Sequence, residues 1–350
     1  MRIALFHTTL PEPGRKPGGV EVLVHRLANA LVRTGEHTVT VFSLTGAPAD
    51  AAYSHRRLFP RMPWLASNLI ARWVVLPFLL NFVRFGSHEV VHLHGDDWFF
   101  IARRLPTVRT MHGSALNEGR AAQTIKRRVT QYLLYPMEHL SVRLATIAAA
   151  VGQRTAEIYG IQEILRNGVD LQRFRPGAKS ATPRVLYVGT WGGRKRGAWA
   201  HEIFTQRVVA DVPGAELVFV SDRSRDHPSV INVSFPDDET LAGLYRESWV
   251  FAYPSLYEGF GLPYVEALAS GVAIVTSDNE GAREVLESGR HGVVANDDAF
   301  ASQVVELLRD TERRRSLETG GLRRARDFSW DIVTDRHLDV YGKAIARWST

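Results

Sequence analysis

Short apolar runs rich in β-branched residues alternate with segments of helical periodicity along the chain, and the whole alternation occurs twice. Most of the runs are continuously apolar, as expected for parallel strands that are buried on both faces of a sheet. In the first half they are RIALFH, HTVTVFSL, EVVHLHG, PTVRTMHG and LATIAAA, and in the second half RVLYVGT, ELVFVSD, WVFAYPS, VAIVTSD and HGVVAN. Segments 22–31 and 239–246 are examples of the helices between them. The pattern predicts an α/β fold made of two Rossmann-like, doubly wound domains.

A chain of 350 residues is too long for one ordinary hydrophobic core, which also favours two domains. The stretch FRPGAKSATPR, residues 174–184, is rich in Pro, Gly, Ser and Ala and is the best candidate for a linker between them. Two such domains facing each other leave a cleft at the carboxyl ends of their strands, where ligands of these folds usually bind.

The composition excludes several kinds of chemistry. The chain has no cysteine, which rules out disulfides, thiolate nucleophiles and cysteine-based zinc sites and fits a reducing cytosol. The apolar start MRIALFHTTL is too short for a signal peptide, and the longest charge-free run of the most apolar region, residues 73–83, is too short to span a bilayer. We therefore expect a soluble cytoplasmic protein, with peripheral contact at the inner face of the membrane left open. The net charge of +6 fits nucleic acid, an anionic membrane or phosphate-bearing small molecules as partners.

The stretch PSLYEGFGLPYVEALASG places two glutamates on either side of a glycine turn that follows a predicted strand. The proline after the turn predicts that a helix starts there and holds Glu266 in its first turn. Gly259 and Gly261 allow backbone amides to approach an anion such as a diphosphate, and the carboxylates of Glu258 and Glu266 suit the vicinal diols of a ribose or a sugar. The alternative is a structural glycine turn followed by a glutamate that favours the helix start. The spacing matches neither a P-loop nor a dinucleotide fingerprint.

Two further glycine-containing turns carry candidate binding residues. Gly18 and Gly19 start an amphipathic helix and are either a second backbone site for an anion or a flexible loop. The turn WGGRKRG, after RVLYVGT, carries Arg194, Lys195 and Arg196, which can clamp phosphates by charge and bidentate hydrogen bonds. A solvated basic surface is the alternative for this triplet.

Histidines mark the ends of two predicted strands in the first half. His112 is followed by glycine and is placed to hydrogen-bond a substrate, with a purely structural role as the alternative. His92 and His94 stand close to Asp96 and Asp97, and this set of residue types can ligate zinc. The sequence offers no convincing further ligand, so we do not expect a metal site.

The segment IKRRVTQYLLYPMEHL places Ile125, Val129, Leu133 and Leu140 on one helical face beside the basic run 126–128. We predict an ordinary helix whose apolar face packs in the core and whose basic side is solvated. The alternative is that this helix and the apolar region 64–85 form a greasy acceptor side close to a membrane.

Taken together, these motifs resemble the retaining glycosyltransferases of family 4, which have the GT-B fold of two Rossmann-like domains facing a central cleft. PSLYEGFGLPYVEALASG is similar to the Glu-x7-Glu signature of that family, and TSDNEGAREVL with GRHGVV is similar to its continuation. NGVDLQRFRP, VGTWGGRKRG, PGGVE, TMHG and the last segment DFSWDIVTDRHLDVYGKAI are similar to other parts of the family in the same order. The resemblance implies an N-terminal acceptor domain (1–174), a C-terminal donor domain (175–328) and a final helix (329–350) that crosses back to the first domain.

The resemblance also implies how a nucleotide-sugar donor is bound. Glu258 is expected to meet sugar hydroxyls near the reaction centre, Glu266 the ribose of the nucleotide, and His112 the sugar that is transferred. Backbone contacts to the diphosphate and the sugar are expected from Gly18, Gly19, Gly259, Phe260, Gly261 and Leu262.

The phosphate-binding turn departs from the family pattern at one position. The family commonly has an arginine directly after the Val-Gly of this turn, where the present chain has Thr190. We expect the basic triplet to supply charge to the leaving group instead, with Arg194 binding the donor and either Lys195 or Arg196 acting as the catalytic cation.

The implied activity is transfer of a hexose, with retention of its anomeric configuration, from a nucleoside diphosphate sugar to a hydroxyl group of a glycan, a lipid or a small molecule. UDP is favoured as the nucleotide, on family frequency alone. Neither a metal nor another cofactor is expected, because cationic side chains can stabilise the leaving diphosphate, and nucleic acid is not an expected partner. Two alternatives stay open: a nucleotide-sugar epimerase or hydrolase of the same fold, and a non-catalytic basic protein that binds membranes or nucleic acid.

Overall fold

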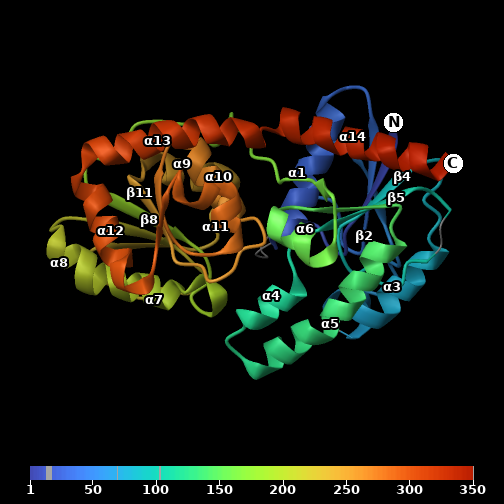
Figure 1. Ribbon diagram of the computed structural model, residues 1–350, viewed down its shortest axis with the longest axis horizontal. Helices are drawn as coiled ribbons and strands as arrows, with labels where there is room; N and C mark the ends of the chain where they lie inside the picture. The colour runs from blue at the N-terminus through green and yellow to red at the C-terminus, as the bar shows by residue number, and fades with distance from the viewer. Residues whose placement is uncertain (13–17, 69, 102–103, 350) are drawn as a thin grey trace. The chain divides into compact units, whose positions relative to one another are not determined.

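The computed structural model describes residues 1–12, 18–68, 70–101 and 104–349. The contacts among them divide the chain into two compact units (Figure 1). Unit 1 consists of Met1–Leu116, Val129–Gly168 and Trp330–Thr350, and unit 2 of Asn117–Arg128 and Val169–Ser329. The main passage from unit 1 to unit 2 therefore lies ahead of the Pro- and Gly-rich stretch 174–184.

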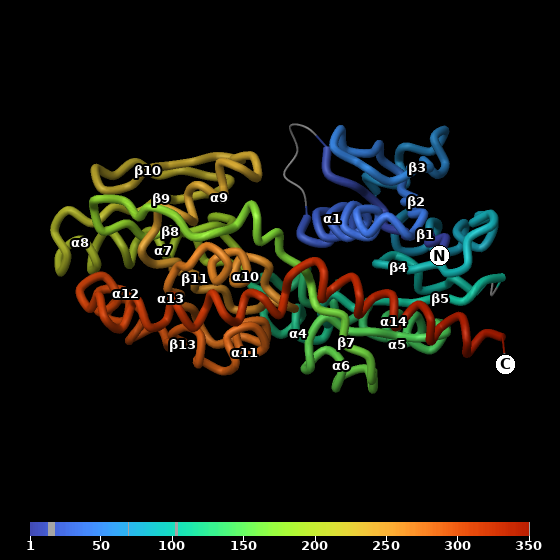
Figure 2. Tube along the Cα trace, turned by 90° about the horizontal axis from the view of Figure 1, so that it is seen from above, coloured from blue at the N-terminus to red at the C-terminus, as the bar shows by residue number. Residues whose placement is uncertain are grey.

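Unit 1 is built on a parallel sheet of seven strands in the order β3-β2-β1-β4-β5-β6-β7, which Figure 2 shows from β3 to β5. The strands are β1 (Arg2–Phe6), β2 (Thr38–Ser43), β3 (Ser54–Arg57), β4 (Val90–Leu93), β5 (Thr107–Met111), β6 (Ile147–Ala150) and β7 (Glu163–Ile164). Its helices are α1 (Gly19–Arg33), α2 (Trp64–Ser67), α3 (Leu76–Leu79), α4 (Ala115–Arg120), α5 (Ile125–Leu144), α6 (Gln153–Tyr159) and α14 (Trp330–Ser349); α4 and α5 each have one end in unit 2. A π-helical turn, η1 (Ala71–Val75), and a 3-10 turn, η2 (Leu80–Phe82), flank α3.

Unit 2 is built on a parallel sheet of six strands in the order β10-β9-β8-β11-β12-β13. The strands are β8 (Arg184–Val188), β9 (Glu216–Val220), β10 (Val230–Val233), β11 (Val250–Tyr253), β12 (Ala273–Ser277) and β13 (Val293–Ala295). The helices are α7 (Gly197–Ile203), α8 (Val209–Asp211), α9 (Asp238–Glu247), α10 (Leu262–Ala269), α11 (Glu280–Val285), α12 (Asp297–Arg309) and α13 (Thr311–Ala325). Shorter turns are η3 (Gly193–Lys195), η4 (Phe204–Val208), η5 (Glu287–Gly289) and η6 (Arg326–Phe328).

Every apolar run predicted as a strand forms one, so the prediction of two doubly wound α/β domains is confirmed. The sequence did not reveal β3, β7 and β10, which are all edge strands of their sheets. The segment SHRR of β3 is polar because most of its side chains are exposed, and it therefore lacks the apolar run of a central strand.

The hydrophobic core of unit 1 contains residues from both the N-terminal and the C-terminal part of the chain. Leu23, Val24, Leu27 and Leu31 of α1 are buried against the sheet, as the helical spacing of these residues requires. The same cluster includes Val333, Val340, Tyr341 and Ala344 of α14, the last helix. Because α14 packs on α1, the C-terminal residues belong to unit 1 although they follow unit 2 in the sequence.

The prediction for the apolar face of α5 is wrong. Ile125, Val129, Leu133 and Leu140 are 79%, 52%, 61% and 39% exposed, so this face points to solvent and not into the core. The side of the helix that packs inward carries Leu134 and Ser141. Within the described ranges, no helix is long and apolar enough to cross a membrane.

Candidate functional site

Two segments far apart in the sequence meet at the carboxyl ends of the central strands of unit 2. Strands β8 and β11 are direct parallel neighbours, with Val185 opposite Val250. The turn after β8 carries the basic triplet, and the loop after β11 carries Glu258. Because the carboxyl ends of neighbouring parallel strands lie side by side, the turn with the triplet and the loop with the glutamate come together.

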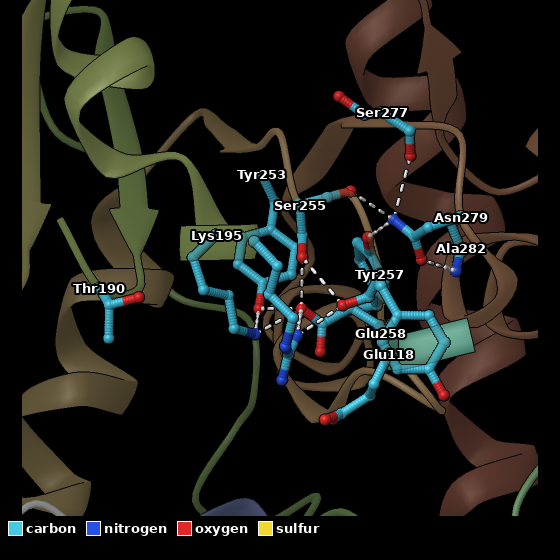
Figure 3. A network of polar contacts seen from close by, with 12 residues as sticks. Glu118, Thr190, Lys195, Tyr253, Ser255, Tyr257, Glu258, Ser277, Asn279 and Ala282 are labelled. Atoms are coloured by element: carbon cyan, nitrogen blue, oxygen red, sulfur yellow. Dashed lines mark hydrogen bonds and ion pairs between the residues drawn. The ribbon is translucent and has the colours of Figure 1, made fainter. Parts of the chain in front are cut away.

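Glu258 is the centre of a buried cluster of polar side chains (Figure 3), and only 5% of the residue is exposed. Four donors point to its Oε1 atom: Ser255 Oγ at 2.6 Å, Arg194 Nη1 at 2.7 Å, Tyr253 OH at 2.9 Å, and Lys195 Nζ. Lys195 also donates to the hydroxyl of Tyr253. A carboxylate held by this many donors has a fixed orientation.

The charges of the cluster determine its ionisation. Burial by itself would raise the pKa of the Glu258 carboxyl, but Lys195 and Arg194 outweigh it and hold this pKa below its usual range. Burial by itself would lower the pKa of Arg194, but the carboxylate of Glu258 outweighs it, so this pKa lies above its ordinary value. At neutral pH the three side chains therefore carry one net positive charge, which favours an anionic ligand.

The backbone beside Glu258 requires glycine at two positions. Gly261 ends the loop with φ at +92°, and a Cβ atom there would lie 2.4 Å from the ring of Tyr264. A Cβ atom on Gly281 would lie 2.4 Å from the carbonyl oxygen of Phe260. The amide of Gly281 donates to the carbonyl oxygen of Glu258 at 2.9 Å. The start of α11 therefore packs directly on the loop that carries the glutamate.

Asn279 fastens the loop to α11 (Figure 3). Its Oδ1 accepts a hydrogen bond from the amide of Ala282 at 2.9 Å and caps the helix. Its Nδ2 donates to the carbonyl oxygen of Ser255 at 3.0 Å and to the hydroxyl of Tyr264 at 2.8 Å. One side chain thus fixes a helix start, the loop and α10 relative to one another.

The helix after the loop starts at Leu262 and has Pro263 in its first turn, as predicted. The placement of Glu266 in the first turn is wrong: Glu266 is the fifth residue of α10, and it is buried. The first turn is complete before residue 266 because the helix already begins at Leu262. Glu266 therefore lies one turn further into the helix than the sequence predicted.

The basic triplet is divided between two sides of its turn. Arg194 and Lys195 point to Glu258, whereas Arg196 makes two hydrogen bonds of 2.7 Å to the carboxylate of Asp297. The guanidinium carbon of Arg196 also lies 3.9 Å from the ring centroid of Trp199. The structure thus brings Arg194 and Lys195 together with Glu258 and leaves Arg196 in a separate ion pair.

In unit 1, the predicted residue His112 follows β5 and lies beside His94, which follows β4. Nδ1 of His94 and Nε2 of His112 are 3.0 Å apart, which is hydrogen-bond distance, and the two rings are stacked. Burial lowers the pKa of both imidazoles well below the ordinary value, so both are neutral at pH 7.

His92, Asp96 and Asp97, which raised the question of a metal, are all engaged by other side chains. The two ring nitrogens of His92 lie 2.7 Å from the hydroxyls of Tyr341 and Thr110. The carboxylates of Asp96 and Asp97 pair with arginines at 2.7 Å and 3.1 Å. No group of three or more potential ligands is arranged around a metal position within the part of the chain that the structure describes.

The glycine pair of unit 1 stands at the start of α1 as predicted. Gly18 is the residue before the helix and has an extended backbone, and Gly19 is the first helical residue. A Cβ atom on Gly19 would meet no atom of the described residues within 4 Å. Pro17, the first residue of PGGVE, lies outside the described residues.

Two family models match the chain, one for each half. A model of the glycosyltransferase family 4 matches residues 17–173, and a model of glycosyl transferases group 1 matches residues 182–310. The chain belongs to the family 4 glycosyltransferases. The family inferred from the motifs is thereby confirmed.

Relatives of this glycosyltransferase match nearly its whole length. The GDP-mannose:cellobiosyl-diphosphopolyprenol alpha-mannosyltransferase of Xanthomonas oryzae is 26% identical, and the match covers 94% of both chains. The phosphatidyl-myo-inositol mannosyltransferase of Mycobacterium tuberculosis is 26% identical, and the match covers 93% of both chains. Among solved structures, the sucrose-phosphate synthase of Thermosynechococcus elongatus has a TM-score of 0.77 at 20% identity and covers 99% of both chains. This similarity confirms the GT-B fold.

Sequence reasoning missed three residues of the glycosyltransferase that hold Glu258 in place: Tyr253, Ser255 and Asn279. Asn279 carries a usable signal, because asparagine directly before the helical segment EGAREV is a preferred capping residue. Tyr253 and Ser255 lie in and after a buried strand, where no local pattern separates a tyrosine that packs from one that also donates to a carboxylate.

Proposed function

We propose that this glycosyltransferase transfers mannose from GDP-mannose to a hydroxyl group of a lipid-carried acceptor, with retention of the anomeric configuration. Support comes from the names of two relatives that match over 94% and 93% of the chain. Both are named mannosyltransferases; one name gives GDP-mannose and a diphosphopolyprenol, and the other gives phosphatidyl-myo-inositol. These names favour GDP over UDP as the nucleotide and favour a lipid among the three acceptor classes.

The observation that carries the proposal is the cluster of Arg194, Lys195 and Glu258. Transfer breaks the bond between C1 of the sugar and an oxygen of the diphosphate and forms a bond from C1 to the acceptor oxygen. The proton of the acceptor hydroxyl goes to the leaving diphosphate, on the same face of the sugar. Negative charge grows on the diphosphate in the transition state, and two partly desolvated cations at that position stabilise it.

In this scheme Glu258 has two successive tasks. Before the donor binds, it balances one of the two neighbouring positive charges and keeps both cations in place. Once the diphosphate lies beside the cations, the carboxylate oxygens accept hydrogen bonds from hydroxyl groups of the sugar. Because Arg194 and Lys195 provide the positive charge, the reaction needs no metal ion. The rate of transfer should therefore be the same in the presence and in the absence of EDTA.

The other roles follow the positions implied by the family. Glu266 binds the ribose, and neutral His112 hydrogen-bonds the mannose. Backbone amides contact the diphosphate and the sugar at Gly18, Gly19, Gly259, Phe260, Gly261 and Leu262. The acceptor is presented at a membrane surface, with which the protein makes peripheral contact.

Thermal unfolding with added nucleotides tests the donor. A ligand that binds only the folded protein stabilises it by about 2.7 kcal/mol at a concentration 100 times its Kd. GDP should therefore raise the melting temperature more than UDP, ADP or dTDP at the same concentration. A larger shift with UDP would return the donor to a UDP sugar and leave the transferase assignment intact.

A matched pair of variants tests the site. Lys195→Met removes a cation that contacts Glu258 and should abolish mannose transfer, while Arg196→Met removes the neighbouring cation and should leave most of it. Equal losses in both would contradict the assigned site. Incubation of the wild type with GDP-mannose and no acceptor separates the alternatives, because complete loss of donor would indicate a hydrolase or epimerase.

A further inference from the structure

The exposed face of α5 is apolar along most of its length. Val129, Leu133 and Leu140 follow one another at helical spacing and are all exposed, with Ile125 on the same face at the start of the helix. A helix of a water-soluble domain normally turns such a stripe toward the core. On α5 the stripe lies opposite Leu134, the side chain that is buried.

The polar side chains on the other face of α5 fix this orientation. Glu138 accepts a hydrogen bond from the amide of Ala115 at 2.9 Å and another from the hydroxyl of Tyr159. Ser141 donates to the carboxylate of Asp97 at 3.0 Å inside the core. Rotating the helix to bury its apolar stripe would break these hydrogen bonds. The exposure of the stripe is therefore built into the fold.

A second apolar stripe lies on the neighbouring segment of η1, α3 and η2. Val74, Phe78 and Phe82 are 49%, 58% and 65% exposed. The rings of Phe78 and Phe82 pack edge to face, with their centroids 5.6 Å apart. The spacing of four residues again puts them on one helical face.

The two stripes belong to elements that pack on each other. Trp73 of η1, the turn directly before α3, packs in one hydrophobic cluster with Leu134 and Tyr135 of α5. We call the exposed side chains Val74, Phe78, Phe82, Val129, Leu133 and Leu140 the apolar surface. Exposed apolar side chains that lie together on the surface usually mark an interaction site.

The two sequence segments that carry the apolar surface are basic, although two of their arginines, Arg72 and Arg127, pair with Asp96 and Glu118 from outside these segments. Residues 51–88 contain five arginines and no aspartate or glutamate, and residues 119–137 contain four basic residues and again no acidic one. Lys126 and Arg128 are exposed on the first turns of α5. A partner that covers apolar side chains and also offers negative charge at their rim fits this pattern better than a second, equally basic copy of the chain.

We propose that the apolar surface inserts into the outer part of an anionic lipid bilayer, with Lys126 and Arg128 binding lipid headgroups. Apolar contact and charge together give stable binding, since either one alone is weak and reversible. The proposal rests on the proposed lipid-carried acceptor, because it assigns the surface by which the enzyme reaches that acceptor.

Vesicle flotation with the full chain tests the proposal. Phosphatidylcholine vesicles that contain phosphatidylglycerol should carry the protein upward at low salt, and vesicles of phosphatidylcholine alone should carry much less. The double variant Phe78→Ser/Phe82→Ser should lower the bound fraction by about tenfold or more, since two exposed phenyl groups are lost from the interface. Lys126→Glu/Arg128→Glu should lower it as well and weaken its dependence on salt.

The matched control is Phe235→Ser in unit 2, where the phenylalanine is 60% exposed but lies outside the apolar surface. It should bind vesicles like the wild type. All three variants change exposed side chains, so their melting temperatures should stay close to that of the wild type. Equal loss of binding in the control and in Phe78→Ser/Phe82→Ser would overturn the assignment of the surface.

Two further outcomes would overturn the proposal. One is a protein that does not float with either vesicle; the other is a dimer in analytical ultracentrifugation that Phe78→Ser/Phe82→Ser abolishes, which would assign the surface to a second copy. Transfer to a short-chain acceptor in detergent is measured alongside. Because this assay needs no bilayer, its result reports on the proposed function alone and separates a failure of that function from a failure of membrane docking.

Discussion

Replacing Glu258 with glutamine tests the electrostatics of the buried cluster. The substitution keeps the shape of the side chain but removes the charge that Arg194 and Lys195 share, and the side chains of these two cations are only 28% and 18% exposed. Removing one partner of a buried ion pair costs about 3–5 kcal/mol, and we expect the lower end here because water reaches the cations. A loss of about 3 kcal/mol corresponds to a fall in melting temperature of roughly 6–12 °C for a domain of this size.

Asp297→Asn provides the matched control for Glu258→Gln. Asp297 pairs with Arg196 of the same triplet through two hydrogen bonds of 2.7 Å, but its side chain is 59% exposed. The Arg196 side chain is only 11% exposed, but water reaches the pair through Asp297, so we expect a cost of about 1 kcal/mol and a fall in melting temperature of no more than a few degrees. Thermal unfolding followed by circular dichroism measures both variants, and turnover of GDP-mannose with acceptor measures their activity. Equal shifts in melting temperature, or normal turnover in Glu258→Gln, would refute the reasoning.

The effect of Glu258→Gln on stability should also depend on pH. The pKa of Glu258 is lower in the folded protein than its ordinary value, so the unfolded chain takes up a proton first as the pH falls. The stabilisation from the ion pairs is therefore complete above about pH 5 and is lost as the pH falls through the folded pKa. The difference in unfolding free energy between wild type and variant should be constant from pH 6 to 8 and should shrink in acid.

Two other substitutions and one pH profile test the remaining geometry. Gly261→Ala should destabilise the protein by about 1–3 kcal/mol, because the position has a φ of +92° and a Cβ atom would meet Tyr264. Its control is Gly243→Ala inside α9, where a Cβ atom would meet no atom of the described residues within 4 Å; this variant should be neutral or stabilising in the same thermal unfolding experiment. His94→Ala should lower the turnover number while GDP still binds, because the side chain lies 3.0 Å from His112 and holds that ring in place; unchanged turnover would contradict this. The unfolding free energy should fall as the pH drops below about 6.5, because the unfolded histidines take up protons that the buried His94 and His112 do not.

The fold was predictable because the central strands are buried on both faces. Such strands need continuous apolar runs, and RVLYVGT or VAIVTSD leaves few other interpretations. The edge strand β3 obeys a weaker constraint, since its sequence SHRR pairs on one side only and is largely exposed. Polar residues are compatible with an edge strand as well as with a loop, so composition alone does not separate the two.

The candidate site was predictable in its residues but not in its pairing. The sequence placed the basic triplet and Glu258 after two strands, but it could not say which cations face the glutamate. That choice depends on backbone geometry: Arg196 has φ at +57°, and its guanidinium lies on Trp199 and Asp297. Arg194 and Lys195 point the other way, to Glu258. The backbone conformation of the turn sets the direction of each side chain, and the sequence of three basic residues does not predict it.

Helix α5 shows a different limit of sequence reasoning. Periodicity identifies an apolar face, but it does not say whether that face meets the core, a lipid or water. The structure turns the opposite face inward, where Glu138 forms a partly buried hydrogen bond and Ser141 a buried one, while Leu133 stays exposed. A charged side chain on the inner face of a helix costs several kcal/mol unless it is hydrogen-bonded or paired with an opposite charge. The orientation that gives Glu138 its hydrogen-bond partners is therefore favoured, although it leaves Leu133 exposed. The same contacts that keep α5 on unit 1 therefore also present its apolar stripe outward, where a bilayer can cover it.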